Sequence, residues 1–121
     1  MHTVLIADDD FISLEVLKAM LEEFPLDLLV ANNGQEALDL CLAHEPELLI
    51  LDYDMPDLTG AEVCRTLRQN SAFADTPIVA LTGHQSVSEL NACRTAGMNE
   101  TIHKPVSPDT LAVLLREYLS L

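Results

Sequence analysis

The sequence predicts an α/β domain in which a parallel β-sheet is covered by helices on both faces. Short runs rich in valine, isoleucine and leucine recur along the chain without strict polar alternation, which is typical of strands buried on both faces. Amphipathic segments with helical spacing lie between these runs. Strands that alternate with helices in this way favour a parallel sheet with right-handed crossovers.

Five strands follow from the aliphatic runs. They are expected at residues 3–7, 27–31, 47–51, 77–81 and 101–103. The first two helices occupy the intervening segments, near residues 13–24 and 34–44, and the third lies near residues 60–69. The first helix carries apolar residues at helical spacing, and Asn33 is a good N-cap for the second. The apolar residues of the first helix are Leu14, Leu17, Leu21 and Phe24.

The last two helices begin at recognisable signals. Ser86 followed by Glu89 is a capping-box pattern, and Gly97 is a suitable residue to follow the end of that helix. Ser107 is an N-cap with Pro108 at the first helical position, and the final helix continues to Tyr118.

Length and composition indicate one folded domain covering residues 1–121, with no effector domain in this chain. The sequence has 121 residues, 49% of them hydrophobic, and a mean hydropathy of +0.20, which exclude a disordered chain. No apolar run approaches the roughly 18 residues of a membrane span, and no signal peptide precedes the first strand. Cys41, Cys64 and Cys93 lie far apart and are expected to be buried in helices in a reducing cytoplasm.

The charge of the chain excludes some partners. Twenty acidic residues against six basic ones give a formal net charge of −14. A chain of this charge is unsuited to binding nucleic acid or an anionic membrane by itself. It also suggests that some carboxylates lie close enough together to favour a cation.

Chemically active side chains follow the predicted strands. Asp8, Asp9 and Asp10 follow the first strand, and Asp52 follows the third. The later strands are followed by Thr82, Gly83 and His84, and by Lys104 with Pro105. The carboxyl ends of parallel strands meet at one edge of a sheet, where ligands bind at the point of reversed strand order. We therefore expect these groups to converge.

The expected cluster has the composition of a phosphoryl-acceptor site. Asp8, Asp9 and Asp52 would repel one another unless a cation neutralises them, and oxygen-only ligands favour Mg²⁺ over Zn²⁺. The backbone carbonyl of Asp54 could add a further ligand. The Lys104 ammonium can pair with a phosphate oxygen, or with Asp52 when the site is empty. The Thr82 hydroxyl can donate a hydrogen bond. Taken alone, however, three consecutive aspartates could equally form a solvated turn or a helix start.

Four stretches of the chain together resemble the receiver domain of two-component response regulators. They are VLIADDD at residues 4–10, LLILDYDMPDLTG at 48–60, PIVALTG at 77–83 and HKP at 103–105. The resemblance implies a flavodoxin-like (βα)₅ three-layer sandwich, with a five-stranded parallel sheet of order 2-1-3-4-5. It also implies a signalling domain, not a separate enzyme, that assists its own phosphorylation and dephosphorylation.

The resemblance further implies roles for individual residues. Asp52 would accept a phosphoryl group from the phosphohistidine of a histidine kinase or a histidine phosphotransfer protein. Asp8 and Asp9 would hold Mg²⁺, Thr82 would follow the phosphate, and Lys104 would pair with it. The Lys104–Pro105 bond is often cis in such proteins.

The sequence departs from the family pattern at one position and leaves two others variable. Thr101 stands where receivers usually carry the aromatic switch residue, so we expect weak coupling from Asp52 to the last helices, or a domain that mainly relays phosphate. Asp54 and His84 occupy positions that tune the lifetime of the acyl phosphate in the family. His84 could equally be an exposed loop residue.

Alternatives remain at the level of surfaces and function. Ile12, Val16 and Met20 form a second apolar line on the first helix, which is either a wide core face or a docking face for a phosphohistidine-bearing helix bundle. The last helices could serve a homodimer or a parent protein. There are two rival functions. One is a receiver that binds a partner without phosphorylation. The other is a haloacid-dehalogenase-like phosphatase, because the stretch DYD resembles the nucleophile motif of that class.

Overall fold

The computed structural model describes residues 1–84 and 86–121, which form one five-stranded parallel sheet of order β2-β1-β3-β4-β5. This is the predicted flavodoxin-like sandwich. The strands are β1 (His2–Ala7), β2 (Leu26–Ala31), β3 (Leu48–Asp52), β4 (Ile78–Thr82) and β5 (Glu100–His103). The helices are α1 (Phe11–Leu21), α2 (Gly34–His44), α3 (Gly60–Arg68), α4 (Val87–Ala96) and α5 (Pro108–Leu119), with a short 3₁₀ helix at Ser71–Phe73.

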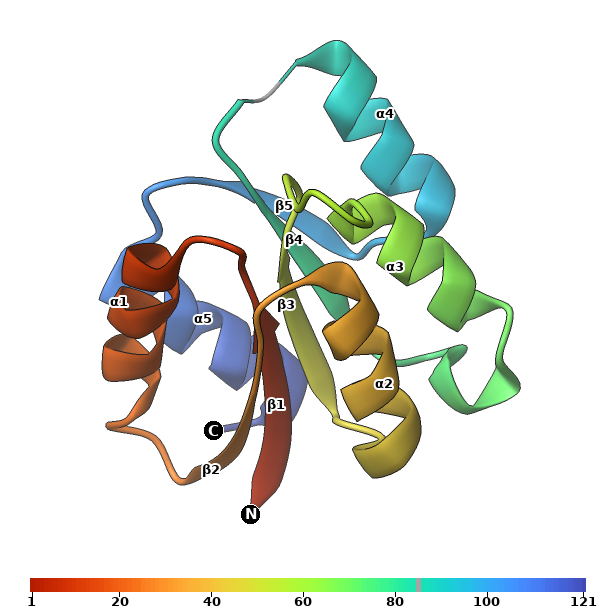
Figure 1. Ribbon diagram of the computed structural model, residues 1–121. Helices are drawn as coiled ribbons and strands as arrows, with labels where there is room; N and C mark the ends of the chain where they lie inside the picture. Colours follow the sequence, from red (N-terminus) through yellow and green to blue (C-terminus); the bar gives the residue numbers. More distant parts are fainter. Residues whose placement is uncertain (85) are drawn as a thin grey trace.

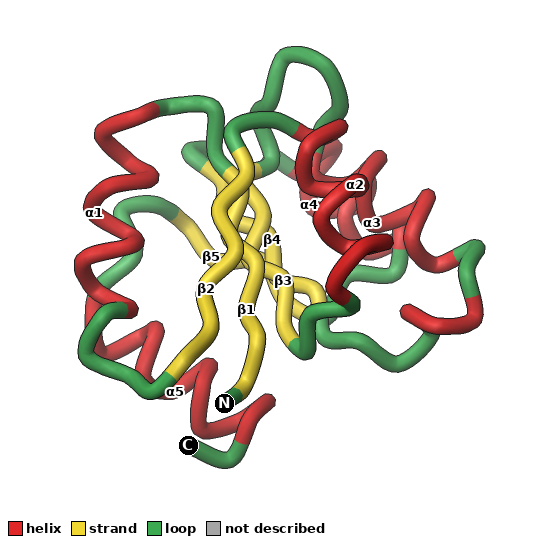
Figure 2. The backbone as a smooth tube through the Cα atoms, turned by 60° about the horizontal axis from the view of Figure 1, so that its bottom comes forward, coloured by secondary structure: helices red, strands yellow, loops and turns green. Residues whose placement is uncertain are grey.

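The helices form two layers on opposite faces of the sheet (Figures 1 and 2). Helices α1 and α5 cover one face, and α2, α3 and α4 cover the other. The central strands alternate between the two cores: in β3, Leu48 and Ile50 face α1 and α5, whereas Leu49 and Leu51 face the other layer. Because both faces are buried, both sets of side chains are apolar, which explains the runs without polar alternation.

The three cysteines lie in the core beneath α2, α3 and α4. All are buried, free thiols, as expected from their spacing. Burial raises the pKa of the Cys41 thiol to about 12, so this group is not a nucleophile at neutral pH.

The first helix and the third strand depart from the predicted boundaries. Helix α1 begins at Phe11, two residues before the prediction, because the Asp10 side chain accepts hydrogen bonds from the backbone of Ile12 and Ser13. It ends at Leu21 and not at Phe24. Strand β3 begins one residue later than predicted and includes Asp52 as its last residue. The 3₁₀ helix before β4 was not predicted.

The other helices start where the sequence places them, but of the capping-box pattern at Ser86 and Glu89 only the bond from the Glu89 amide to the Ser86 side chain is present among the described residues. Asn33, Ser86 and Ser107 each cap the following helix through the side chain, and Thr59 forms a complete capping box with Glu62. Across the described residues, none of the helices is both long enough and apolar enough to cross a membrane.

Candidate functional site

The candidate site lies at the carboxyl ends of β1 and β3, where the order of strands reverses. From β1 the chain passes through α1 to β2 on one side, and from β3 it passes through α3 to β4 on the other. The two helices therefore lie on opposite faces of the sheet (Figure 1). In such sheets, ligands bind outside the carboxyl ends of the strands at this point. Asp8 directly follows β1, and Asp52 ends β3.

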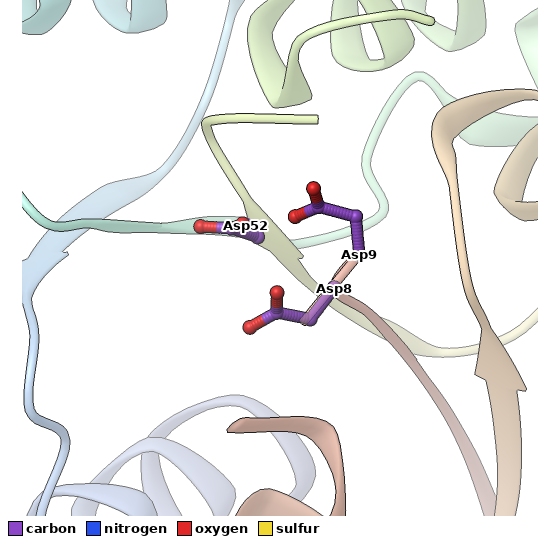
Figure 3. A group of neighbouring side chains, drawn as sticks. All are labelled: Asp8, Asp9 and Asp52. Carbon is purple, nitrogen blue, oxygen red and sulfur yellow. The ribbon is translucent and has the colours of Figure 1, made fainter. Parts of the chain in front are cut away.

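Asp8, Asp9 and Asp52 form a cluster of carboxylates at this edge of the sheet (Figure 3). One oxygen of each lies within 4.8 Å of the others. Asp8 is 2% exposed and Asp52 is 5% exposed, whereas Asp9 is exposed to solvent. Three like charges in this space, two of them buried, need a positive charge nearby.

Lys104 provides one such charge from the loop after β5. Its Nζ atom lies 3.0 Å from Oδ2 of Asp8 and 3.1 Å from Oδ1 of Asp52. Burial by itself lowers the pKa of the Lys104 ammonium, but the hydrogen bonds to Asp8 and Asp52 outweigh it and raise the pKa above its ordinary value. The Lys104–Pro105 peptide bond is cis. One lysine balances only part of the charge of three aspartates.

The electrostatic imbalance appears in the titration of Asp52. Burial raises the pKa of this carboxyl from 3.8 to about 7, against the hydrogen bond from Lys104, which lowers it; the nearby Asp8 raises it further. A carboxylate in this state gains from any additional cation that reaches it.

A buried hydroxyl lies at the carboxyl end of β4, at the same edge of the sheet. Thr82 is the last residue of β4 and is fully buried, and its Oγ1 atom has no hydrogen-bond partner in the described part of the chain. The backbone carbonyl of Thr82 accepts a 2.7 Å hydrogen bond from the Lys104 amide. Buried hydroxyls are normally satisfied, so this one is available to a ligand at the site.

The loop from Tyr53 to Thr59 forms one wall of the site. A hollow of about 310 Å³ opens beside the carboxylates, lined by Asp9, Asp54, Met55, Pro56 and Thr59. Met55 is buried and anchors the loop, whereas the side chain of Asp54 is exposed. Gly60 begins α3 directly after this loop. A side chain does not fit at Gly60, because a Cβ atom there would lie 2.8 Å from the carbonyl oxygen of Asp52.

Two further predicted positions lie away from the carboxylate cluster. His84 is exposed in the loop after β4. Thr101 is half-buried in β5, and its hydroxyl adjoins the Cys93 thiol. Burial raises the pKa of Cys93, and the contact with Thr101 partly opposes this rise. A hollow of about 250 Å³ lies over this part of β5, lined by Leu90, Arg94, Met98, Asn99, Glu100 and Thr101.

An apolar surface adjoins the site on the α1 side. Phe11 is 70% exposed, Ile12 is 72% exposed and Val16 is 47% exposed. For Ile12 and Val16, this excludes the wide core face that the sequence left open. Together with Met20, they line a hollow of about 260 Å³ that extends to Lys104 and the segment after it.

Asp57 is a residue whose contacts the sequence reasoning missed. Its carboxylate accepts hydrogen bonds from the backbone of Gly34 and Gln35 at the start of α2. Nothing in the sequence marks this pairing, because the partners are 22 and 23 positions away.

Comparisons with known proteins agree with this geometry. A family model described as response regulator receiver domain matches residues 4–116. The response regulator MprA of Mycolicibacterium vanbaalenii is 39% identical over 116 residues, which cover 96% of this chain and 49% of that protein. MprA of Mycobacterium avium is also 39% identical, with 96% and 50% covered. The chain thus spans about half the length of the curated relatives it matches.

Solved structures show the same architecture. The chemotaxis protein CheY4 of Vibrio cholerae superposes with a TM-score of 0.90 at 28% identity, covering 98% of both chains. The receiver domain of a sensor histidine kinase from Pseudomonas aeruginosa, solved with magnesium in its active-site cleft, has a TM-score of 0.91 at 23% identity. It covers 99% of this chain and 98% of its own. At that identity the second likeness shows the fold alone.

Proposed function

Because this chain belongs to the response regulator receiver domain family of two-component systems, we propose that it accepts a phosphoryl group on Asp52. The donor is the phosphohistidine of a histidine kinase or a histidine phosphotransfer protein. The observation that carries the proposal is the buried, incompletely neutralised Asp52 carboxylate at the switch point of the sheet, beside Asp8 and Lys104. Family membership removes the haloacid-dehalogenase alternative.

The donor atoms of the site fit Mg²⁺. Carboxylate oxygens from Asp8, Asp9 and Asp52 lie within 4.8 Å of one another, and the backbone carbonyl of Asp54 lies in the adjoining loop. An all-oxygen set without histidine or cysteine favours a hard cation. When bound, Mg²⁺ would supply positive charge that neutralises the carboxylates and the phosphoryl oxygens.

The residues of the chain have complementary roles in the transfer. An ionised Asp52 oxygen attacks phosphorus; the new O–P bond forms as the N–P bond of the phosphohistidine breaks, and the imidazole nitrogen keeps the electron pair. Lys104 lies beside the attacking carboxylate and pairs with the charge on a phosphoryl oxygen. The orphaned Thr82 hydroxyl donates a hydrogen bond to another.

The outcome of phosphorylation depends on positions around this core. Asp54, which lines the hollow beside the carboxylates, and His84, which is exposed in the loop after β4, set the lifetime of the acyl phosphate by orienting or excluding the hydrolytic water. Thr101 has no aromatic ring that could move inward when the Thr82 hydroxyl binds the phosphoryl group. We therefore assign this domain to phosphate relay, or to a switch that couples weakly to α4, β5 and α5.

The exposed apolar surface of Phe11, Ile12 and Val16 is the proposed docking face for the helices that carry the phosphohistidine. It adjoins Lys104 and Asp8, so a bound helix would lie next to the acceptor. The α5 surface, with exposed Val113, remains available to a second copy or to the parent protein.

The proposal is tested by incubating the protein with acetyl phosphate and weighing it intact. One added phosphoryl group is expected with Mg²⁺, and none after chelation or in Asp52→Asn. Asp75→Asn, which alters an exposed aspartate in the turn before β4, is the matched control and should be labelled normally. If the wild type gains no phosphoryl group and also fails to bind beryllofluoride with Mg²⁺, the domain is a binding-only receiver. Labelling of Asp52→Asn would refute the assignment of the acceptor.

A further inference from the structure

The Asp57 side chain caps a helix that is remote from it in sequence. Its Oδ1 atom accepts a 3.0 Å hydrogen bond from the Gly34 amide, and its Oδ2 atom accepts a 2.8 Å hydrogen bond from the Gln35 amide. The Asn33 side chain accepts the next amide, that of Glu36, at 2.8 Å. The first three amides of α2 are thus satisfied, two of them by a residue of the loop between β3 and α3.

The same loop packs closely against the start of α2. A Cβ atom at Gly34 would lie 2.7 Å from Cβ of Leu58 and 3.0 Å from the carbonyl oxygen of Leu58. The helix and the loop therefore pack closely where Gly34 meets Leu58, and they are also joined by the Asp57 carboxylate. The two amides also lower the pKa of Asp57, so the carboxylate is charged throughout the neutral range and can hold both bonds.

This contact bears on the wall of the candidate site. The loop is fixed at its start by hydrogen bonds from the Met55 and Gly60 amides to the Tyr53 carbonyl. Between these points Asp54 is exposed, and Asp57 supplies the side-chain tie to α2. A shift of the loop away from α2 would move the Asp54 carbonyl relative to the carboxylates of β1 and β3.

We propose that Asp57 is a positioning residue that fastens the β3–α3 loop to the start of α2, and thereby holds the Asp54 carbonyl in place for the cation. The inference rests on the proposed metal site. Because coupling between two sites is reciprocal, cation binding that orders the loop also protects the amides of Gly34 and Gln35. The start of α2 is then a reporter of the occupied site.

The test combines Mg²⁺ titration calorimetry with amide hydrogen exchange. Asp57→Ala removes both acceptors, Asp57→Asn removes the same charge but keeps one oxygen acceptor, and Asp75→Ala removes a charge at a remote, exposed position. We expect Mg²⁺ affinity to fall about tenfold in Asp57→Ala, less in Asp57→Asn, and not in Asp75→Ala. In the wild type, Mg²⁺ should slow exchange at Gly34 and Gln35.

Equal Mg²⁺ affinities for the two Asp57 variants would show that only charge matters and would overturn the positioning role. So would unchanged exchange at Gly34 and Gln35 when the wild type binds Mg²⁺, a result that stands even where a variant fails to fold. A wild type that binds no Mg²⁺ would overturn the metal site and this inference with it. Mg²⁺ binding that is lost in Asp52→Asn but kept in Asp57→Ala would leave the proposed function intact and reject Asp57 alone.

Discussion

Replacing Asp52 by asparagine should stabilise the metal-free protein. Burial raises the pKa of Asp52 from 3.8 to about 7, so the ionised carboxylate is disfavoured in the folded state even with Lys104 beside it. Since one pKa unit corresponds to about 1.4 kcal/mol, the cost at pH 8 is about 4 kcal/mol as an upper value. Asparagine has nearly the same shape and carries no charge. We expect a gain of about 2–4 kcal/mol in the free energy of unfolding at pH 8.

The pH dependence of this gain follows from the direction of the shift. Between pH 4 and pH 7 the unfolded chain has released the Asp52 proton and the folded protein still holds it, so wild-type stability from this group falls as pH rises. The advantage of Asp52→Asn should therefore be near zero at pH 4, grow up to pH 7, and then level off.

Urea denaturation in the presence of a chelator measures both features. Asp75→Asn is the control for loss of an exposed carboxylate and should change the free energy of unfolding by less than about 0.5 kcal/mol. An Asp52→Asn variant no more stable than wild type at pH 8, or one whose advantage is the same at pH 4 and pH 8, would refute the claim that the buried charge is costly.

Two further substitutions test how the structure holds the site and its surroundings. Gly60→Ala should destabilise the protein by about 1–3 kcal/mol, because the new Cβ meets the Asp52 backbone, whereas Gly83→Ala meets nothing within 4 Å among the described residues and should be tolerated in the same urea experiment. Arg68→Ala removes hydrogen bonds from the guanidinium to the carbonyls of Gly97 and Phe73, so it should lower the free energy of unfolding by about 2 kcal/mol. Arg65→Ala, on the exposed face of the same helix, should lower it by less than about 0.5 kcal/mol. Thermal unfolding measures both effects.

The fold could be predicted because its information is local. The aliphatic runs identify strands buried on both faces, and side-chain caps such as Asn33, Ser86 and Ser107 mark helix starts. The start of α1 was misplaced for a reason that is also local. Phe11 and Ile12 are apolar but exposed, so the buried stripe of this helix begins only at Leu14, and the cap at Asp10 lies outside that stripe.

The candidate site was predictable in its membership but not in its geometry. The strand-end rule for parallel sheets brings Asp8, Asp52, Thr82 and Lys104 to one edge without any knowledge of distances. The unsatisfied hydroxyl of Thr82 and the incomplete neutralisation by Lys104 depend on packing, and only the structure shows them. The Asp57 contact was out of reach because it depends on how α2 docks against a loop distant in sequence.

Because burying the Asp52 charge is costly, the free energy of unfolding should respond to a cation bound at the site. A ligand that binds only the folded state stabilises it by about 2.7 kcal/mol at a concentration one hundred times its dissociation constant. This is comparable with the penalty of the ionised carboxylate, so a cation at Asp8 and Asp52 would offset much of the strain that Asp52→Asn relieves by removing the charge. The two effects should therefore not add: Mg²⁺ should raise the stability of the wild type strongly and that of Asp52→Asn weakly. Equal stabilisation of both proteins would mean that the cation binds elsewhere.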